Sequence, residues 1–226
     1  MRLPEKSSAS SAATKIKTGA ELLRALEERS RRPLPSAPPL DALEGGGLKR
    51  GSLIELCGRR SSGRFALALS ALAAVTRAGE AAALVDPGDH LDVHGAEAAG
   101  VALERLLWIR PPSLRQALVC AQACLGAGFA LVVLDLGERK WEKAPEGCWR
   151  RLALDAEASN SVVLLISRAP TAGPAAESLI EAGAARAVWD KNGPPLLTGL
   201  QAQLTLRRRR GRGAGGQVPL SLPLGD

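Results

Sequence analysis

The sequence predicts an α/β fold in which a mostly parallel sheet carries helices on both faces and is followed by an antiparallel hairpin. From about residue 40 onward, short apolar runs alternate with helical patterns, which is typical of parallel strands that are buried on both faces. Hydrophobic residues form 46% of the 226-residue chain, enough for one sizeable core. We expect strands at 53–57, 81–86, 106–109, 129–135, 161–167 and 184–189, and helices at 65–75, 92–100, 114–125, 149–159 and 175–182.

The N-terminal region differs from this alternating part. Thr18 and Glu21 have the spacing of a capping box, and the helix that follows must end by Pro33. A proline-rich stretch at 33–39 then resembles a semi-rigid spacer. We therefore divide the chain into an N-terminal helical arm with its spacer (1–39) and a core domain (40–226). The arm has a narrow apolar stripe, which we expect to bind its own core or a partner; it consists of Leu22, Leu23 and Leu26.

The C-terminal region predicts the hairpin. Residues 200–207 and 217–224 both alternate in polarity, and glycines lie between them. Pro219 and Pro223 confine the second strand to an edge or a bulge.

A glycine-rich stretch after the first strand has the spacing of a phosphate-binding P-loop. In such a loop, backbone N–H groups surround a phosphate, a lysine reaches its outer oxygens and a hydroxyl holds Mg²⁺. Here arginine replaces the lysine and phenylalanine replaces the hydroxyl residue, so the metal loses its protein ligand. The loop could still bind an anion without turning it over, or serve only to connect a strand to a helix. Its residues are Gly58, Arg59, Arg60, Ser61, Ser62, Gly63, Arg64 and Phe65.

Several stretches together carry a resemblance to the RecA recombinases. They are the approach to the P-loop at 46–58, the runs 84–86, 90–92 and 100–107, and the strand 131–135, whose Asp135 matches the Walker B acid. The resemblance covers roughly residues 40–222 and implies a RecA-like P-loop fold. The whole pattern most resembles the ImuA family, RecA-like accessory proteins of bacterial mutagenesis cassettes. That family is sometimes described as SulA-like, which makes inhibition of cell division the alternative function.

Departures from the recombinase pattern predict that the chain is not an ATPase. The glutamate that activates water in recombinases matches Gly88, and the sensor glutamine matches Arg168. An aspartate at the end of a buried strand can also cap the chain or pair with Arg64, so Asp135 is weak support for Mg²⁺. We expect no cofactor, although residual ATP binding or hydrolysis stays an alternative.

The resemblance implies a non-catalytic adaptor in SOS-induced translesion synthesis. Its implied partners are an inactive Y-family polymerase paralogue of the ImuB type, an error-prone replicative-type polymerase, RecA and DNA without sequence preference. No apolar run approaches the ~20 residues of a membrane span, and the first 18 residues lack the apolar core of a signal peptide. These features predict a cytoplasmic, nucleoid-associated protein with no membrane partner.

Two basic clusters are candidate DNA contacts, in a chain with a net charge of +7. The first is expected at the solvent-exposed turn of the hairpin, where its members cannot all find carboxylate partners: Arg207, Arg208, Arg209, Arg210 and Arg212. The second follows the Walker B strand, where Trp141 could stack on a base or anchor the loop: Arg139, Lys140, Trp141 and Lys143.

Metal and disulfide sites are not expected. His90 and His94 are four residues apart and close to several aspartates, but this segment looks like the start of a surface helix with Asp89 as its N-cap. The four cysteines lack C-x-x-C spacing, so buried free thiols are expected.

Overall fold

The computed structural model describes residues 19–138, 141, 144–190, 196–211, 213 and 215–223. The chain forms two compact units, the first ending at Arg31 and the second starting at Arg32. In the first unit the described residues form helix α1, Gly19–Arg31. The elements of the second unit are α2 (Pro38–Glu44), β1 (Ser52–Gly58), α3 (Arg64–Arg77), β2 (Ala82–Val85), α4 (Val93–Ala98), η1 (Leu103–Arg105), β3 (Leu106–Ile109), α5 (Leu114–Gly126), β4 (Leu131–Asp135), α6 (Cys148–Ser159), β5 (Val162–Ser167), η2 (Gly173–Ala175), β6 (Ser178–Ala182), β7 (Arg186–Trp189), β8 (Leu197–Arg209) and β9 (Gln217–Pro223).

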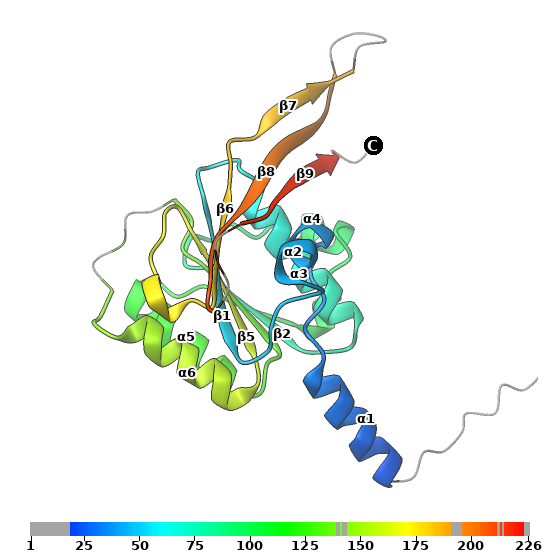
Figure 1. Ribbon diagram of the computed structural model, residues 1–226, viewed down its shortest axis with the longest axis vertical. Helices are drawn as coiled ribbons and strands as arrows, with labels where there is room; N and C mark the ends of the chain where they lie inside the picture. Colours follow the sequence, from blue (N-terminus) through cyan, green and yellow to red (C-terminus); the bar gives the residue numbers. More distant parts are fainter. Residues whose placement is uncertain are drawn as a thin grey trace, which may run out of the picture. The chain divides into compact units, whose positions relative to one another are not determined.

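A single sheet contains all nine strands of the described residues, in the order β3-β2-β4-β5-β1-β6-β8-β7, with β9 paired to β8 (Figure 1). The pairs among β1 to β6 are parallel, whereas β8 is antiparallel to β6, β7 and β9. The predicted α/β class and the predicted C-terminal hairpin are confirmed.

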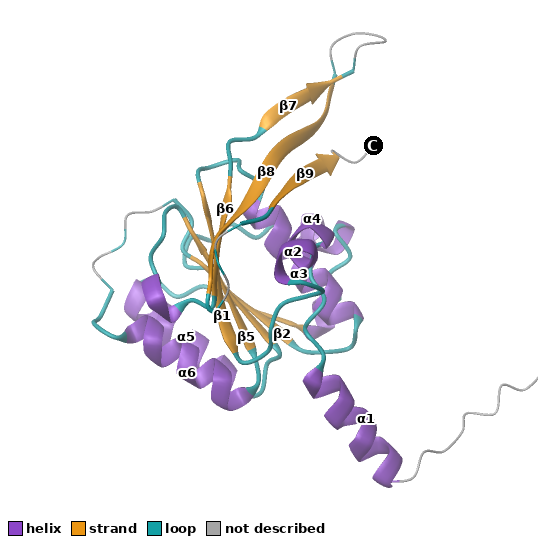
Figure 2. Cartoon of the chain, in the orientation of Figure 1, coloured by secondary structure: helices purple, strands orange, loops and turns teal. Residues whose placement is uncertain are grey.

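Helices cover both faces of the parallel part of the sheet (Figure 2). Alternate residues of β1 point to opposite faces, so Ile54 packs in the core under α3 and Leu53 packs in the core under α5 and α6. Every residue of β1, β4 and β5 is buried. This explains their nearly continuous apolar sequences.

The proline-rich stretch at 33–39 lies within the second unit, although we expected it to separate the arm from the core. Leu34 is fully buried, and its N–H and C=O both bond the backbone of Leu48 at 2.8 Å. Pro38 begins α2, where the fixed φ of proline suits the first turn of a helix. The boundary between the units therefore falls before this stretch.

The helix predicted at 175–182 is wrong. Residues 173–175 form a 3₁₀ turn, and Ser178–Ala182 is strand β6, which joins β1 on one side and β8 on the other. The alternating buried positions are Ser178, Ile180 and Ala182. Alanine, glutamate and leucine favour a helix, but two neighbouring strands supply this segment with backbone partners and a core face, and tertiary context overrides the preference.

Two smaller observations concern the cysteines and the helices. All four cysteines are free; Cys57 and Cys124 are buried, while Cys120 and Cys148 are half-buried. Among the helices that the structure describes, none is both long enough and apolar enough to cross a bilayer.

Candidate functional site

The P-loop connects the end of β1 to the start of α3, as its spacing predicts. Ser61 and Gly63 adopt positive φ, and Gly63 is the residue before α3. At Gly58 a side chain is excluded, because a Cβ atom would lie 2.7 Å from the Ala182 carbonyl oxygen. The loop and Asp135 lie together around a cavity of about 510 Å³, so the structure brings the predicted nucleotide-loop residues to one place.

Arg64 is buried and turned back into the protein. Its guanidinium donates hydrogen bonds to the Gly58 carbonyl and to the Glu138 carboxylate. The second oxygen of Glu138 lies 3.8 Å from Nε of Arg168, the residue at the sensor position. Glu138 thus pairs with both arginines, and Arg64 does not pair with Asp135 as we considered. The sequence analysis did not single out Glu138. This residue follows β4 by three positions, and because β4 ends beside the P-loop, that position could have indicated a P-loop contact.

Phe65, which replaces the metal-binding hydroxyl residue, packs against a histidine. Its ring meets the His90 ring edge-on, with centroids 6.5 Å apart and an interplanar angle of 75°. The same imidazole lies against Gly88, where a Cβ atom would overlap it. The space beside Gly88 is therefore filled by His90.

Asp135 faces His90. Oδ2 of Asp135 lies 3.1 Å from Nδ1 of His90, and Oδ1 accepts a hydrogen bond of 2.8 Å from the Gly137 N–H. Burial raises the pKa of the Asp135 carboxyl, while the Gly137 N–H and His90 oppose the rise.

The predicted N-cap is one turn too early. Asp92 caps α4, accepting hydrogen bonds from the backbone N–H groups of His94 and Gly95. Asp89 has a positive φ of 56° and lies 3.4 Å from Arg110 instead. His90 precedes the helix, so the two histidines do not share a helical face.

The last strand covers the P-loop. A Cβ atom at Gly63 would lie 2.7 Å from Leu222 Cδ1 and 2.8 Å from Leu220 Cδ2, so these leucines touch the loop backbone. Leu222 and Leu200 also line the cavity. One wall of the cavity beside the P-loop is therefore aliphatic.

The first basic cluster lies mostly in β8 and is not a free hairpin tip. Arg207, Arg208 and Arg209 belong to the strand. Arg207 pairs with Glu181 at 2.6 Å, and Arg208 donates to the carbonyls of Ala176 and Gly173 at 3.1 and 2.5 Å.

The other two described arginines also have partners. Arg209 donates to the Glu44 carbonyl at 2.8 Å and lies 3.5 Å from the Glu44 carboxylate. Arg210 donates to the Pro174 carbonyl at 3.0 Å and lies 3.9 Å from Glu177. All four described arginines are thus hydrogen-bonded. Arg208 has backbone carbonyls and, among the described residues, no carboxylate as partner, in line with the expectation that the arginines cannot all find carboxylate partners. They still differ in exposure: 56% for the Arg207 side chain and 62% for Arg210, against 15% for Arg209.

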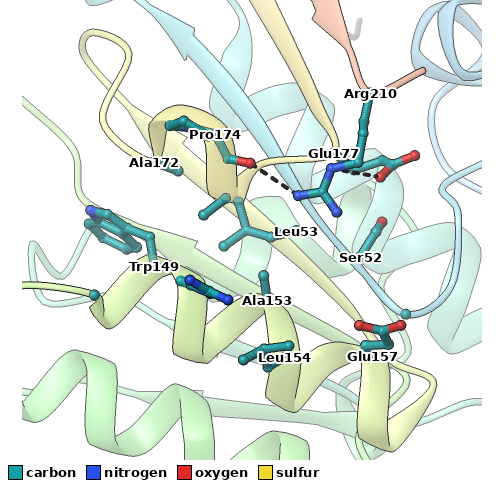
Figure 3. Close-up of a pocket in the computed structure, with 14 residues that line it drawn as sticks. Ser52, Leu53, Trp149, Ala153, Leu154, Glu157, Ala172, Pro174, Glu177 and Arg210 are labelled. Carbon is teal, nitrogen blue, oxygen red and sulfur yellow. Dashed lines mark hydrogen bonds and ion pairs between the residues drawn. The ribbon is translucent and has the colours of Figure 1, made fainter. Parts of the chain in front are cut away.

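Arg210 borders a second cavity, of about 630 Å³, on the side of the sheet covered by α6 (Figure 3). Figure 3 shows its guanidinium directed toward Pro174 and Glu177, while Leu53, Ala153 and Leu154 form an apolar part of the lining. The arginine cluster is thus separate in sequence and in lining residues from the P-loop cavity.

The remaining predicted site residues lie after β4, in α1 and after β8. Trp141 is half-buried against the core and donates from Nε1 to the Leu136 carbonyl at 2.7 Å, as an anchor would. In α1, Leu23 is 63% exposed, and the side chains of Leu22 and Leu26 are not described. Four further candidates lie outside the described residues: Arg139, Lys140, Lys143 and Arg212.

Comparison with known proteins agrees with the predicted resemblance at the level of RecA. Residues 36–137 match the model of the RecA N-terminal domain. RecA of Rippkaea orientalis is 41% identical over 97 residues, which are 42% of this chain and 28% of that protein. RecA of Rubrobacter xylanophilus is 43% identical over 95 residues, with the same two coverages. The chain thus spans less than a third of the curated relatives that it matches.

The solved structures extend the likeness to the fold. The crystal structure of the RadB recombinase aligns with a TM-score of 0.59 and 21% identity, covering 80% of this chain and 92% of that one. The chain is RecA-like, in sequence over residues 36–137 and in fold over most of its length.

Proposed function

We propose that this RecA-like chain is a non-hydrolysing adaptor that binds DNA during SOS-induced translesion synthesis. The observation that carries the proposal is the internal pairing of Arg64 with Glu138 in the P-loop. In a working P-loop, the cationic side chain reaches the outer phosphates. Here a carboxylate of the protein takes the role of that anion.

The other catalytic roles are missing as well. Phe65 offers no oxygen to Mg²⁺, and Gly88 offers no base to activate water. Arg168, at the sensor position, is paired with the same Glu138. Because four distinct roles have changed together, we infer that the fold is used for binding and not for phosphoryl transfer.

We assign DNA contact to Arg207 and Arg210, whose side chains are exposed although each has a carboxylate neighbour. Exposed ion pairs contribute only about 0.2–1 kcal/mol, so a phosphate can compete for these side chains. The net charge of +7 favours a polyanion. We further propose, from the ImuA resemblance, an ImuB-type polymerase paralogue, an error-prone polymerase and RecA as partners in the cytoplasm, at the nucleoid.

The first experiment measures ATP hydrolysis by the purified chain with and without single-stranded DNA. We expect no turnover above background. Glu138→Gln, which frees Arg64 and Arg168, should increase binding of a fluorescent ATP analogue without creating turnover. Wild-type hydrolysis that Arg64→Ala removes would show that the chain is an enzyme.

The second experiment measures binding of a fluorescent single-stranded oligonucleotide by anisotropy across a salt series. Replacing Arg207 and Arg210 with Ala should weaken binding to all sequences alike and reduce the slope of log affinity against log salt by about 1.4, at ~0.7 per phosphate contact. A matched control replaces Arg115 and Arg186, which are exposed and lie elsewhere, and changes the net charge equally. If both double variants lose the same affinity, only net charge matters and the assigned contact is refuted.

A third experiment separates the adaptor from the SulA-like alternative. Tagged protein is recovered from cells after DNA damage, and its partners are identified by mass spectrometry. Polymerase subunits among them would support the adaptor. The tubulin-like division protein in their place would support division inhibition.

A further inference from the structure

Three side chains beside the P-loop cavity converge on one point. Nδ1 of His90 lies 3.1 Å from Oδ2 of Asp135 and 3.5 Å from Oδ1 of Asp86. One ligand atom from each residue lies within 4.8 Å of the others. We propose that Asp86, His90 and Asp135 form a binding site for a divalent transition-metal ion of the Zn²⁺ type, a site that the sequence did not predict.

In each carboxylate, backbone N–H groups hold one oxygen and the other oxygen faces Nδ1 of His90. Oδ2 of Asp86 accepts hydrogen bonds from the backbone N–H groups of His90 and Leu91, at 2.7 and 3.0 Å, and from Trp108 Nε1 at 3.3 Å. Oδ1 of Asp135 is held in the same way by Gly137. Such outer contacts orient metal ligands in known sites.

The free oxygen of Asp86 is the second, independent sign of a ligand. Asp86 is fully buried, yet its Oδ1 accepts a hydrogen bond from no described residue. An unsatisfied buried carboxylate oxygen is costly, and it faces the imidazole. A cation between the three side chains would satisfy it.

Two of the three ligand separations fit tetrahedral coordination. At metal–ligand distances of about 2.1 Å, two ligands of a tetrahedron are about 3.4 Å apart. The separations of His90 Nδ1 from the two carboxylate oxygens, 3.1 and 3.5 Å, lie on either side of this value. Three protein ligands leave a fourth position for water or another small ligand.

Two backbone positions without side chains leave room for the imidazole ring. Cβ atoms at Gly88 and at Gly137 would each overlap the His90 ring, so both positions must lack side chains for the ring to lie here. Phe65 contacts the ring edge-on. These contacts restrict the ring orientation without using its nitrogen atoms.

The ligand set selects the ion. One imidazole nitrogen with two carboxylate oxygens suits Zn²⁺, Co²⁺ or Mn²⁺, whereas Mg²⁺ and Ca²⁺ prefer oxygen ligands alone. This site uses neither the P-loop hydroxyl position nor any cysteine. Metal binding at this site requires neither the proposed DNA contact nor the polymerase partners.

The test is calorimetric titration of EDTA-treated full-length protein with ZnCl₂, compared with two variants. His94 is the second of the two histidines in the chain and lies outside the cluster, so His94→Ala is the matched control for His90→Ala. We expect one Zn²⁺ per wild-type chain, unchanged affinity in His94→Ala and at least a tenfold loss in His90→Ala. Asp135→Asn, which retains an oxygen acceptor for Gly137, should lose affinity as well and serves if His90→Ala does not fold.

Two further readouts identify the ligands. Zn²⁺ should raise the melting temperature of the wild type and of His94→Ala, but not of His90→Ala. The Co²⁺-loaded protein should lack a thiolate charge-transfer band. Three outcomes would overturn the proposal: no saturable 1:1 binding, equal losses of affinity in both histidine variants, or a thiolate band. If no saturable binding is found, a proton and not a metal ion joins the three side chains.

Discussion

Replacing Arg209 with Ala should destabilise the protein far more than replacing Arg207, two residues away in the same strand. The Arg209 side chain is 15% exposed, and its partner Glu44 has a fully buried side chain. Removing one member of such a pair leaves a buried charge behind, which costs about 3–5 kcal/mol. Arg207 and its partner Glu181 are 56% and 44% exposed, and such a pair contributes about 0.2–1 kcal/mol.

The difference should also depend on pH. Burial raises the pKa of the Glu44 carboxyl above 4.5, and the Arg209 charge opposes that rise. Without Arg209 the pKa rises further. A carboxyl with a raised folded-state pKa contributes stability that is present at low pH and is lost as the pH rises through that pKa. The Arg209→Ala penalty should therefore be larger at pH 7 than at pH 4.5, where a protonated Glu44 carries no charge for Arg209 to compensate.

Urea unfolding followed by circular dichroism at both pH values measures the two variants against the wild type. In a thermal melt of a domain of this size, the same loss of about 3 kcal/mol would lower the melting temperature by roughly 6–12 °C. Penalties for the two arginines that agree within about 0.5 kcal/mol would refute the assigned structural role of Arg209. A penalty that is independent of pH would refute the role of Glu44.

Three further predictions concern other parts of the fold. Leu34→Ala should lower the free energy of unfolding by about 2–5 kcal/mol, measured by urea titration, because Leu34 is fully buried; a neutral change would mean that residues 33–39 are a spacer after all. Cys57 should resist iodoacetamide at pH 8 in peptide mapping, because burial raises its pKa to about 11; modification of Cys57 before the half-buried cysteines would contradict this. Trp141→Ala should cost about 2 kcal/mol of stability and leave single-strand affinity unchanged, since Trp141 packs on the core and bonds Leu136; a selective loss of single-strand binding would identify a stacking role instead.

The parallel strands could be predicted because burial on both faces requires apolar residues at nearly every position. The runs in β4 and β5 are apolar at nearly every position, and both were located within two residues. Strand β6 lacks a continuous apolar run. Its helix-favouring composition is overridden by pairing with β1 and β8, which are distant in sequence. Its helical prediction failed for that reason.

The P-loop site was predictable in its residues but not in its contacts. Spacing located the loop, and the resemblance to the RecA recombinases pointed to Asp135, which lies beside it. The pairing of Arg64 with Glu138 and the position of His90 depend on how the turns after β4 and β2 fold back. Those turns carry no periodic signal. The partners of the arginine cluster could not be predicted for a related reason, since they come from α2, η2 and β6.

The contact between β9 and Gly63 has a consequence for how the protein is made. The loop and the leucines that cover it are separated by about 160 residues, so they meet only after β8 and β9 have left the ribosome. Until then, the nascent chain presents an uncovered P-loop and a β6 without its antiparallel neighbour. Unpaired strand edges of this kind are aggregation-prone. Ribosome stalling before residue 197 would therefore leave a chain that needs a chaperone, although its parallel strands are already complete.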